Sequence, residues 1–339
     1  MLLPEHMLRA ILAIGLCAAL LIPVPAAAEQ KTREDAIAAC VKYMIPIGDT
    51  DPEPMLEKVA QMDWRAAQAA CVESFVPGEI GWREAYTYAQ ARQAQWQSLR
   101  AAGKDRPDED PFLPQTYLSP SLVKDNAEPY LFNAYLALSY REPYIRELAK
   151  APEDRAMKVE ESIRRTIWGN GRTAERLLFM SACFGSPKAL DVLSDFYTRN
   201  ALDDIMLPVH RRMYERNPEK MKLLAQAREG TEGAARLLAQ KLYAFGIAAI
   251  VVARSWSRDE SDWRKETGLN FLVVSSLAKA RGWERLAGER GEAIDAKDEG
   301  LNRKARLEME KYMHETCGPF LAAQDLFAVS QLEFQPRLE

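Results

Sequence analysis

Histidine is nearly absent from this sequence, and the motifs that hold metal ions are absent altogether. The chain has 3 His, of which His210 and His314 lie beyond residue 28. No CxxC, HxxxH or HExxH spacing occurs, although these are the patterns that bring zinc ligands together. The sequence therefore predicts neither a metal site nor a cofactor.

An excess of positive charge is also missing. Lys and Arg number 45 against 49 Asp and Glu, which leaves a formal net charge of −4. Nucleic-acid binding depends on a clustered basic surface that neutralises phosphates, so we expect no nucleic-acid partner. With 17 Gly, 19 Pro and a hydrophobic fraction of 47%, the composition is that of a globular protein rather than a disordered one.

The first 28 residues have the pattern of a cleaved secretory signal peptide. Arg9 precedes the apolar run Ala10–Ile22, which is shorter than the roughly 20 residues that a membrane-spanning helix needs. The small residues of Ala26-x-Ala28 fit the subsites of a signal peptidase, which predicts cleavage between Ala28 and Glu29. We therefore expect an exported protein, periplasmic or secreted, with no transmembrane segment in the mature chain.

Four cysteines remain once Cys17 leaves with the predicted signal peptide: Cys40, Cys71, Cys183 and Cys317. An even number of cysteines in an oxidising compartment favours disulfides, although four buried thiols would also fit the sequence. Of the three possible pairings, the sequence favours Cys40–Cys71 and Cys183–Cys317. The first of these bonds would join neighbouring helices of an N-terminal hairpin.

Apolar residues recur at helical spacing along the chain, and sustained two-residue alternation is lacking. Ile247–Ala253 could pass for a strand, but it continues the apolar residues before it, so we predict a buried helix there. The sequence thus predicts an all-α fold, either an irregular bundle or a short solenoid of paired helices. The predicted helices run from Thr32 to about Met44 and near residues 54–62, 64–75, 81–102, 127–149, 152–168, 173–184, 187–200, 202–216, 218–228, 232–254, 259–281, 283–315 and 319–330.

Four segments follow from this pattern. After the signal peptide at residues 1–28, we predict an N-terminal helical subdomain at 29–103, a Pro-rich loop or linker at 104–126, and the main helical domain at 127–339. Gly103 is expected to end its helix in the left-handed conformation. Pro143 and Pro208 are expected to kink or split the helices that contain them.

A glycine-rich stretch, Gly169–Ala174, matches the G-x-G-x-x-A pattern of dinucleotide-binding turns. That turn must follow a strand, whereas a helix is predicted before it here, so we expect a helix to end at Gly169 and the next to start with Thr173 as its N-cap. Arg172 and the free backbone N–H groups of such a helix start could hold an anion. Arg172 and Thr173 are therefore the candidate anion site.

Two other patterns bear on catalysis. The Ser-x-x-Lys spacing occurs at Ser121–Lys124 and Ser276–Lys279, as in penicillin-binding proteins, but no β-sheet or K-T-G partner motif accompanies it. Glu161-Ser162 resembles the Glu-Ser pair of helical lytic transglycosylases, in which the glutamate protonates a glycosidic oxygen. The residues after it depart from that family, and helical spacing places Glu161 on a solvated face paired with Arg165.

Because no catalytic arrangement stands out, we expect an exported, non-catalytic helical module that binds a protein partner in the cell envelope or assembles with it. The alternative is a cell-wall enzyme that cleaves glycans on a helical scaffold, with Glu161 or another carboxylate as the general acid.

Overall fold

The computed structural model describes residues 25–76, 79–103, 126–150, 156–198, 218–255, 263–292 and 296–323. Within these ranges every regular element is a helix and no strand occurs, which confirms the all-α prediction. The helices are α2 (Pro25–Val41), α3 (Pro52–Ala60), α4 (Trp64–Ser74), α5 (Trp82–Ala101), α7 (Ala127–Lys150), α8 (Ala156–Cys183), α9 (Pro187–Thr198), α11 (Pro218–Glu229), α12 (Ala234–Ser255), α13 (Trp263–Glu289), α14 (Ala296–Tyr312), the π-helix η2 (Met313–Cys317) and α15 (Gly318–Ala323).

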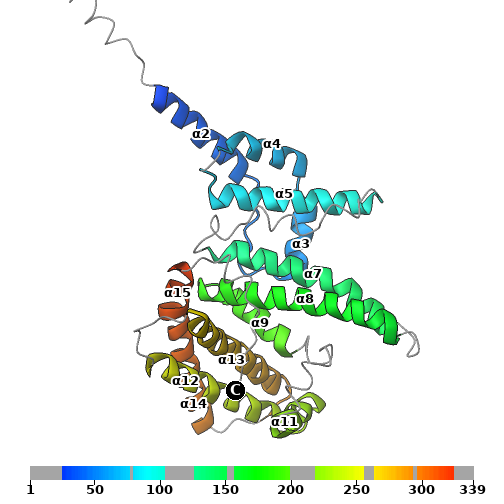
Figure 1. Ribbon diagram of the computed structural model, residues 1–339, viewed down its shortest axis with the longest axis vertical. Coiled ribbons are helices and arrows are strands. Elements are labelled where there is room, and N and C mark those ends of the chain that lie inside the picture. The colour runs from blue at the N-terminus through cyan, green and yellow to red at the C-terminus, as the bar shows by residue number, and fades with distance from the viewer. Residues whose placement is uncertain are drawn as a thin grey trace, which may run out of the picture.

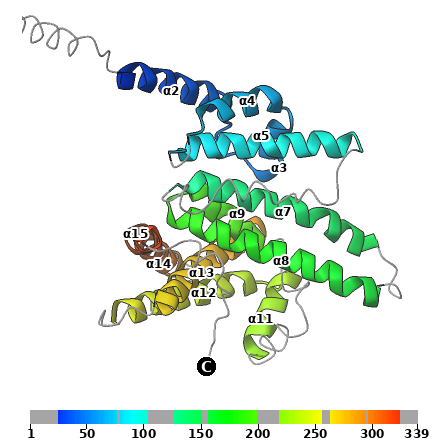
Figure 2. The ribbon, with the colours of Figure 1, turned by 45° about the horizontal axis from the view of Figure 1, so that its top comes forward.

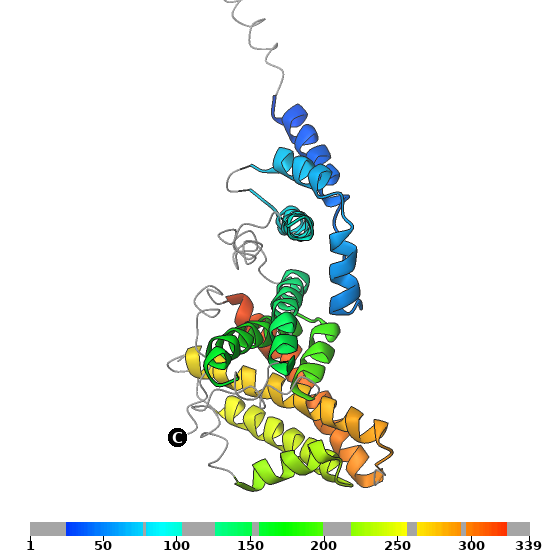
Figure 3. The same ribbon diagram turned by 90° about the vertical axis from the view of Figure 1, so that its right-hand side faces the viewer.

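The helices form an elongated stack (Figure 1). At one end α2, α4 and α5 pack together, and α3 runs from this group toward α7 (Figure 3). The long helices α7 and α8 lie side by side in the middle. Beyond them, α13 packs along both α9 and α12, and α11 and α14 pack on α12 (Figure 2).

The contacts between helices are those of an irregular bundle. In a solenoid each repeat touches only its neighbours in sequence. Here α13 contacts α8, α9, α12 and α14, and the C-terminal η2 and α15 return to α8. α8, the second helix of the predicted main domain, therefore packs against η2 and α15, the last helices of the described chain.

One buried apolar cluster runs from α3 and α5 into the helices of the predicted main domain. The rings of Tyr86 on α5 and Phe132 on α7 meet edge to face with centroids 5.6 Å apart. The Tyr135 hydroxyl donates to the Thr50 carbonyl oxygen at 2.9 Å, and Lys188 pairs with Asp51 at 2.6 Å. The two predicted helical parts thus share a core. The predicted linker lies outside the described residues apart from Asn126, and the domain boundaries stay a prediction.

Several predicted helix ends agree with the structure, because the residues at these ends are enough by themselves to start or stop a helix. The Asp63 carboxylate accepts the Ala66 N–H at 3.2 Å at the start of α4, as an N-cap does. The Ser186 hydroxyl accepts the Ala189 N–H at 3.1 Å, with Pro187 as the first residue of α9. Gly103 has φ 64° after α5, the left-handed conformation expected of it.

Other predicted ends are wrong. α2 begins at Pro25 rather than Thr32, and α8 continues through Gly169 without a break. α7 passes through Pro143, which neither ends nor splits it. The predicted division near Gly282 is also wrong, because α13 continues through this residue and ends at Glu289.

The charged helix predicted over 283–315 is divided instead. The chain turns at Gly291, which has φ 70°, and α14 begins at Ala296. The break predicted near 316–318 does not occur, since η2 joins α14 to α15. The helix predicted at 202–216, with its Pro208, lies outside the described residues.

Candidate functional site

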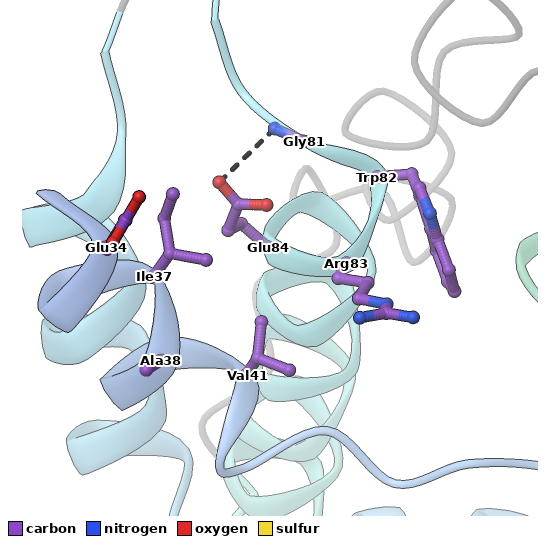
Figure 4. A pocket seen from close by; sticks show the side chains of 8 residues that line it. All are labelled: Glu34, Ile37, Ala38, Val41, Gly81, Trp82, Arg83 and Glu84. Atoms are coloured by element: carbon purple, nitrogen blue, oxygen red, sulfur yellow. Dashed lines mark hydrogen bonds between the residues drawn. The ribbon is translucent and has the colours of Figure 1, made fainter. Parts of the chain in front are cut away.

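A hollow of about 470 Å³ lies between α2 and the N-terminal end of α5 (Figure 4). Its polar centre is Glu84, whose side chain is buried and whose Oε1 accepts the Gly81 N–H at 3.3 Å. This bond satisfies a backbone N–H at the start of α5. The residues that line the hollow are Glu34, Ile37, Ala38, Val41, Gly81, Trp82, Arg83 and Glu84.

Contacts around this hollow hold α2 against α5. The Arg33 guanidinium pairs with the Glu79 carboxylate and donates to its carbonyl oxygen at 2.8 Å, which holds α2 against the segment before α5. Trp82 is directed away from α2 in Figure 4, and the Arg83 guanidinium lies 5.4 Å from its ring centroid. Glu84 accepts the Gly81 N–H at the start of its own helix, and the other carboxyl of the lining is that of Glu34 on α2.

The four cysteines lie in two bonded pairs, Cys40 with Cys71 and Cys183 with Cys317. These are the pairs that the sequence favours. The first joins α2 to α4 with Cα atoms 4.4 Å apart, and the second joins the end of α8 to η2 with Cα atoms 5.4 Å apart. All four side chains are buried. Paired cysteines of this kind fit an oxidising compartment.

The predicted anion site depended on a helix start near Arg172 and Thr173, and the structure has no helix start there. Arg172 and Thr173 lie inside α8 rather than at a helix start, so the helix itself uses the nearby backbone N–H groups. Arg172 Nη1 lies 3.0 Å from Glu175 Oε2. The buried Glu175 carboxylate also accepts the Tyr197 hydroxyl at 2.5 Å, which ties α8 to α9.

The catalytic patterns are not assembled into a site by the described residues. Ser276 is buried on α13, and the Lys279 ammonium lies 4.4 Å from the centroid of the Tyr197 ring. Ser121 and Lys124 lie outside the described residues, and so does the side chain of Glu161. Among the described residues, no group of three or more His, Cys, Asp or Glu could hold a metal ion.

Two features that the sequence did not predict stand out instead. The first is a set of three tryptophan–arginine pairs on α4 and α5, and the exposed side chains of these pairs are called the Trp–Arg surface. Three half-buried tryptophans there each carry an exposed arginine over the ring, at 5.0 to 5.4 Å from guanidinium carbon to centroid. The pairs are Trp64 with Arg65, Trp82 with Arg83, and Trp96 with Arg100. The adjacent Trp-Arg dipeptides at 64–65 and 82–83 are the sequence signal for it.

The second surface is the outer face of α12. The sequence predicts a buried helix over Ile247–Ala253. The helix is present, but only one of its sides is buried, so the prediction of full burial is wrong. By length and composition alone, α12 is long and apolar enough to cross a membrane. Its most apolar 18-residue stretch has a mean hydropathy of 1.5, and 39% of that stretch is buried in the structure. Its exposed large apolar side chains are Leu237, Phe245, Val251 and Val252.

Comparison with known proteins finds no matching family model, no matching curated protein and no matching solved structure.

Proposed function

We propose that this chain is an exported, non-catalytic helical module that binds a protein partner in the cell envelope through the Trp–Arg surface. The observation that carries this proposal is the set of three tryptophan–arginine pairs on α4 and α5. Tryptophan and arginine are the residue types most enriched where partner proteins are held most tightly.

The Trp–Arg surface is preorganised for binding. The Trp96 ring meets Tyr140 of α7 edge to face with centroids 5.5 Å apart, and Trp82 packs near Tyr86. The Cys40–Cys71 disulfide anchors α4 to α2. Side chains fixed in this way lose little conformational entropy when a partner binds, so more of the contact energy appears as affinity.

Export is compatible with this architecture. The N-terminal end of α2 projects from the rest of the molecule (Figure 1). Both the Arg33–Glu79 ion pair and the Cys40–Cys71 disulfide, which hold α2 in place, lie after the proposed cleavage point at residue 28. Removal of the signal peptide therefore leaves these contacts with α2 intact.

Site-specific photocrosslinking in the source organism tests the binding proposal. A photoreactive residue at Glu73, exposed on α4, is expected to give a discrete adduct with an envelope protein. The triple variant Arg65→Ala, Arg83→Ala, Arg100→Ala should reduce that adduct at least about tenfold, because arginines at such positions contribute strongly to affinity.

The matched control is Arg303→Ala, Lys304→Ala, which removes exposed cations from α14 at the other end of the molecule. It should leave the adduct unchanged, and circular dichroism should show both variants folded. An adduct equally reduced by both variants, or by neither, would contradict the Trp–Arg surface as the binding site.

A further inference from the structure

The outer face of α12 is apolar along nearly its whole length. The inner face packs on α11, α13 and α14, where residues such as Leu238, Leu242 and Ile250 are buried. On the outer face the exposed fractions are 44% for Leu237, 46% for Phe245, 61% for Val251 and 47% for Val252, with the exposed Ala244 and Ala248 between them.

These side chains form one ridge, which Lys241 interrupts between Leu237 and Ala244. Their spacing of three, four and seven residues places them on one face of the helix, over about 22 Å from Leu237 to Val252 at 1.5 Å per residue. Apolar side chains gathered on one exposed face of a folded protein often mark an interaction site.

The charge of α12 has one sign. All of its charged residues are cations, Arg236, Lys241 and Arg254, in a chain of net charge −4. Arg254 pairs with Glu308 of α14 at 2.6 Å, and the backbone N–H of Arg236 donates to the Glu292 carboxylate at 3.4 Å. Lys241 is exposed within the ridge and forms no ion pair with any of the described residues.

We propose that the α12 ridge docks onto an anionic lipid surface. The apolar side chains would enter the boundary between headgroups and acyl chains, and the Lys241 ammonium would reach up to the phosphate groups along its flexible stem. α12 would lie in the plane of the surface, because its inner face stays packed on the bundle. There the Tyr243 hydroxyl donates to Glu284 of α13 at 2.8 Å.

Charge favours a lipid surface over a second copy of this chain. Two copies joined through this ridge would bring two Lys241 ammonium groups into an apolar contact, and α12 has no carboxylate to pair with them. Lipid phosphates supply the missing negative charge.

The position of α12 agrees with this role. It lies at the end of the molecule opposite α4 and α5 (Figures 1 and 2). A protein seated on lipid through α12 would therefore keep its Trp–Arg surface away from the membrane. The inference goes beyond the proposed binding function and does not depend on it.

Vesicle sedimentation with the full mature chain tests the inference. The protein should sediment with vesicles of phosphatidylcholine and phosphatidylglycerol, and more weakly with phosphatidylcholine alone. The double variant Phe245→Ser, Val251→Ser should lower the partition coefficient at least about tenfold, since it withdraws two large apolar side chains from the lipid. Lys241→Glu should abolish the preference for phosphatidylglycerol.

Val72→Ser is the matched control, because Val72 on α4 is 57% exposed and Val251 is 61% exposed. It should leave sedimentation unchanged. Failure to sediment with either vesicle, or an equal loss with Val72→Ser, would overturn the inference. So would light scattering that finds a dimer which Phe245→Ser, Val251→Ser dissociates, because the ridge would then hold a second copy.

Discussion

At the scale of single residues, buried polar side chains hold helices together through specific partners. Gln90 on α5 is fully buried and bonds both backbone groups of Ile45, donating at 2.7 Å and accepting at 3.0 Å. Tyr312 on α14 donates to Asn270 of α13 at 2.9 Å. Each such bond fixes the register of one segment on another, because a polar group left unpaired in the interior costs stability.

Tyr312→Phe is expected to destabilise the protein by about 1–2 kcal/mol, because it leaves the fully buried Asn270 carbonyl without its donor. Burial, together with the Glu266 carboxylate, raises the pKa of Tyr312 to about 12, so the hydroxyl stays a neutral donor near pH 7. Urea unfolding measures the loss. The double variant Tyr312→Phe, Asn270→Leu should recover part of it, whereas a further loss of stability would contradict this account.

Glu128→Gln is expected to raise stability slightly at pH 7, by less than about 1 kcal/mol given the partial exposure of the group. Burial raises the pKa of Glu128 above its ordinary 4.5, against the opposing effect of the Arg83 guanidinium. The folded state therefore holds this proton more firmly than the unfolded state does, and the native protein loses stability as pH rises through the folded pKa.

The advantage of Glu128→Gln should accordingly fade as pH falls and vanish below the ordinary pKa, where Glu128 is protonated in both states. Denaturation midpoints across pH 3.5–8 check this. An advantage that grows on acidification would mean that folding lowers the pKa of Glu128 instead of raising it.

At the scale of helices, glycine has two opposite roles in α13. Gly268 has open space around it, whereas a Cβ at Gly282 would lie 2.7 Å from the Ser194 carbonyl oxygen of α9. Gly282 therefore marks the close approach of two helices rather than a helix end. Its sequence neighbourhood does not distinguish these roles, which is why the predicted division there is wrong.

Gly282→Ala should destabilise the protein by about 1–3 kcal/mol, because the new methyl group meets backbone that has no room to move. Gly268→Ala in the same helix should instead be neutral or stabilising by up to about 1 kcal/mol through helix propensity. Thermal unfolding of the two variants gives the comparison. Equal effects would mean that α9 and α13 do not approach closely at Gly282.

At the scale of the whole molecule, the two disulfides constrain very different lengths of chain. Cys40–Cys71 closes a separation of 31 residues, and Cys183–Cys317 closes 134. The unfolded chain loses more entropy from the longer loop, so Cys183→Ala, Cys317→Ala should cost about 1 kcal/mol more than Cys40→Ala, Cys71→Ala.

Loss of the longer disulfide should also free η2 and α15 from α8 first. Hydrogen exchange of peptides from 313–323 would detect this as earlier loss of protection than in α13. Unchanged protection in that segment would show that packing alone retains it.

Processing is the other prediction at this scale. The mature protein should begin at Glu29, because Ala26-x-Ala28 supplies the small residues that signal peptidase requires. N-terminal sequencing of the soluble protein checks the site. Soluble protein that still begins at Met1 would contradict export.

The features that could be predicted from the amino-acid sequence are those that depend on local chemistry. Helical periodicity is a property of neighbouring residues, and so are the Asp63 cap, the proline that starts α9 and the left-handed Gly103. For the same reason the sequence could favour Cys40–Cys71, which joins helices that are close along the chain.

The features that could not be predicted depend on residues distant in sequence. Whether Gly169 breaks a helix, whether Gly282 divides one, and which side of α12 faces solvent all depend on the neighbouring helices. α12 is apolar on nearly every side, so its composition gives no sign of which face the bundle covers. The Trp–Arg surface and the α12 ridge became visible only when the packing of the helices showed which side chains remain exposed.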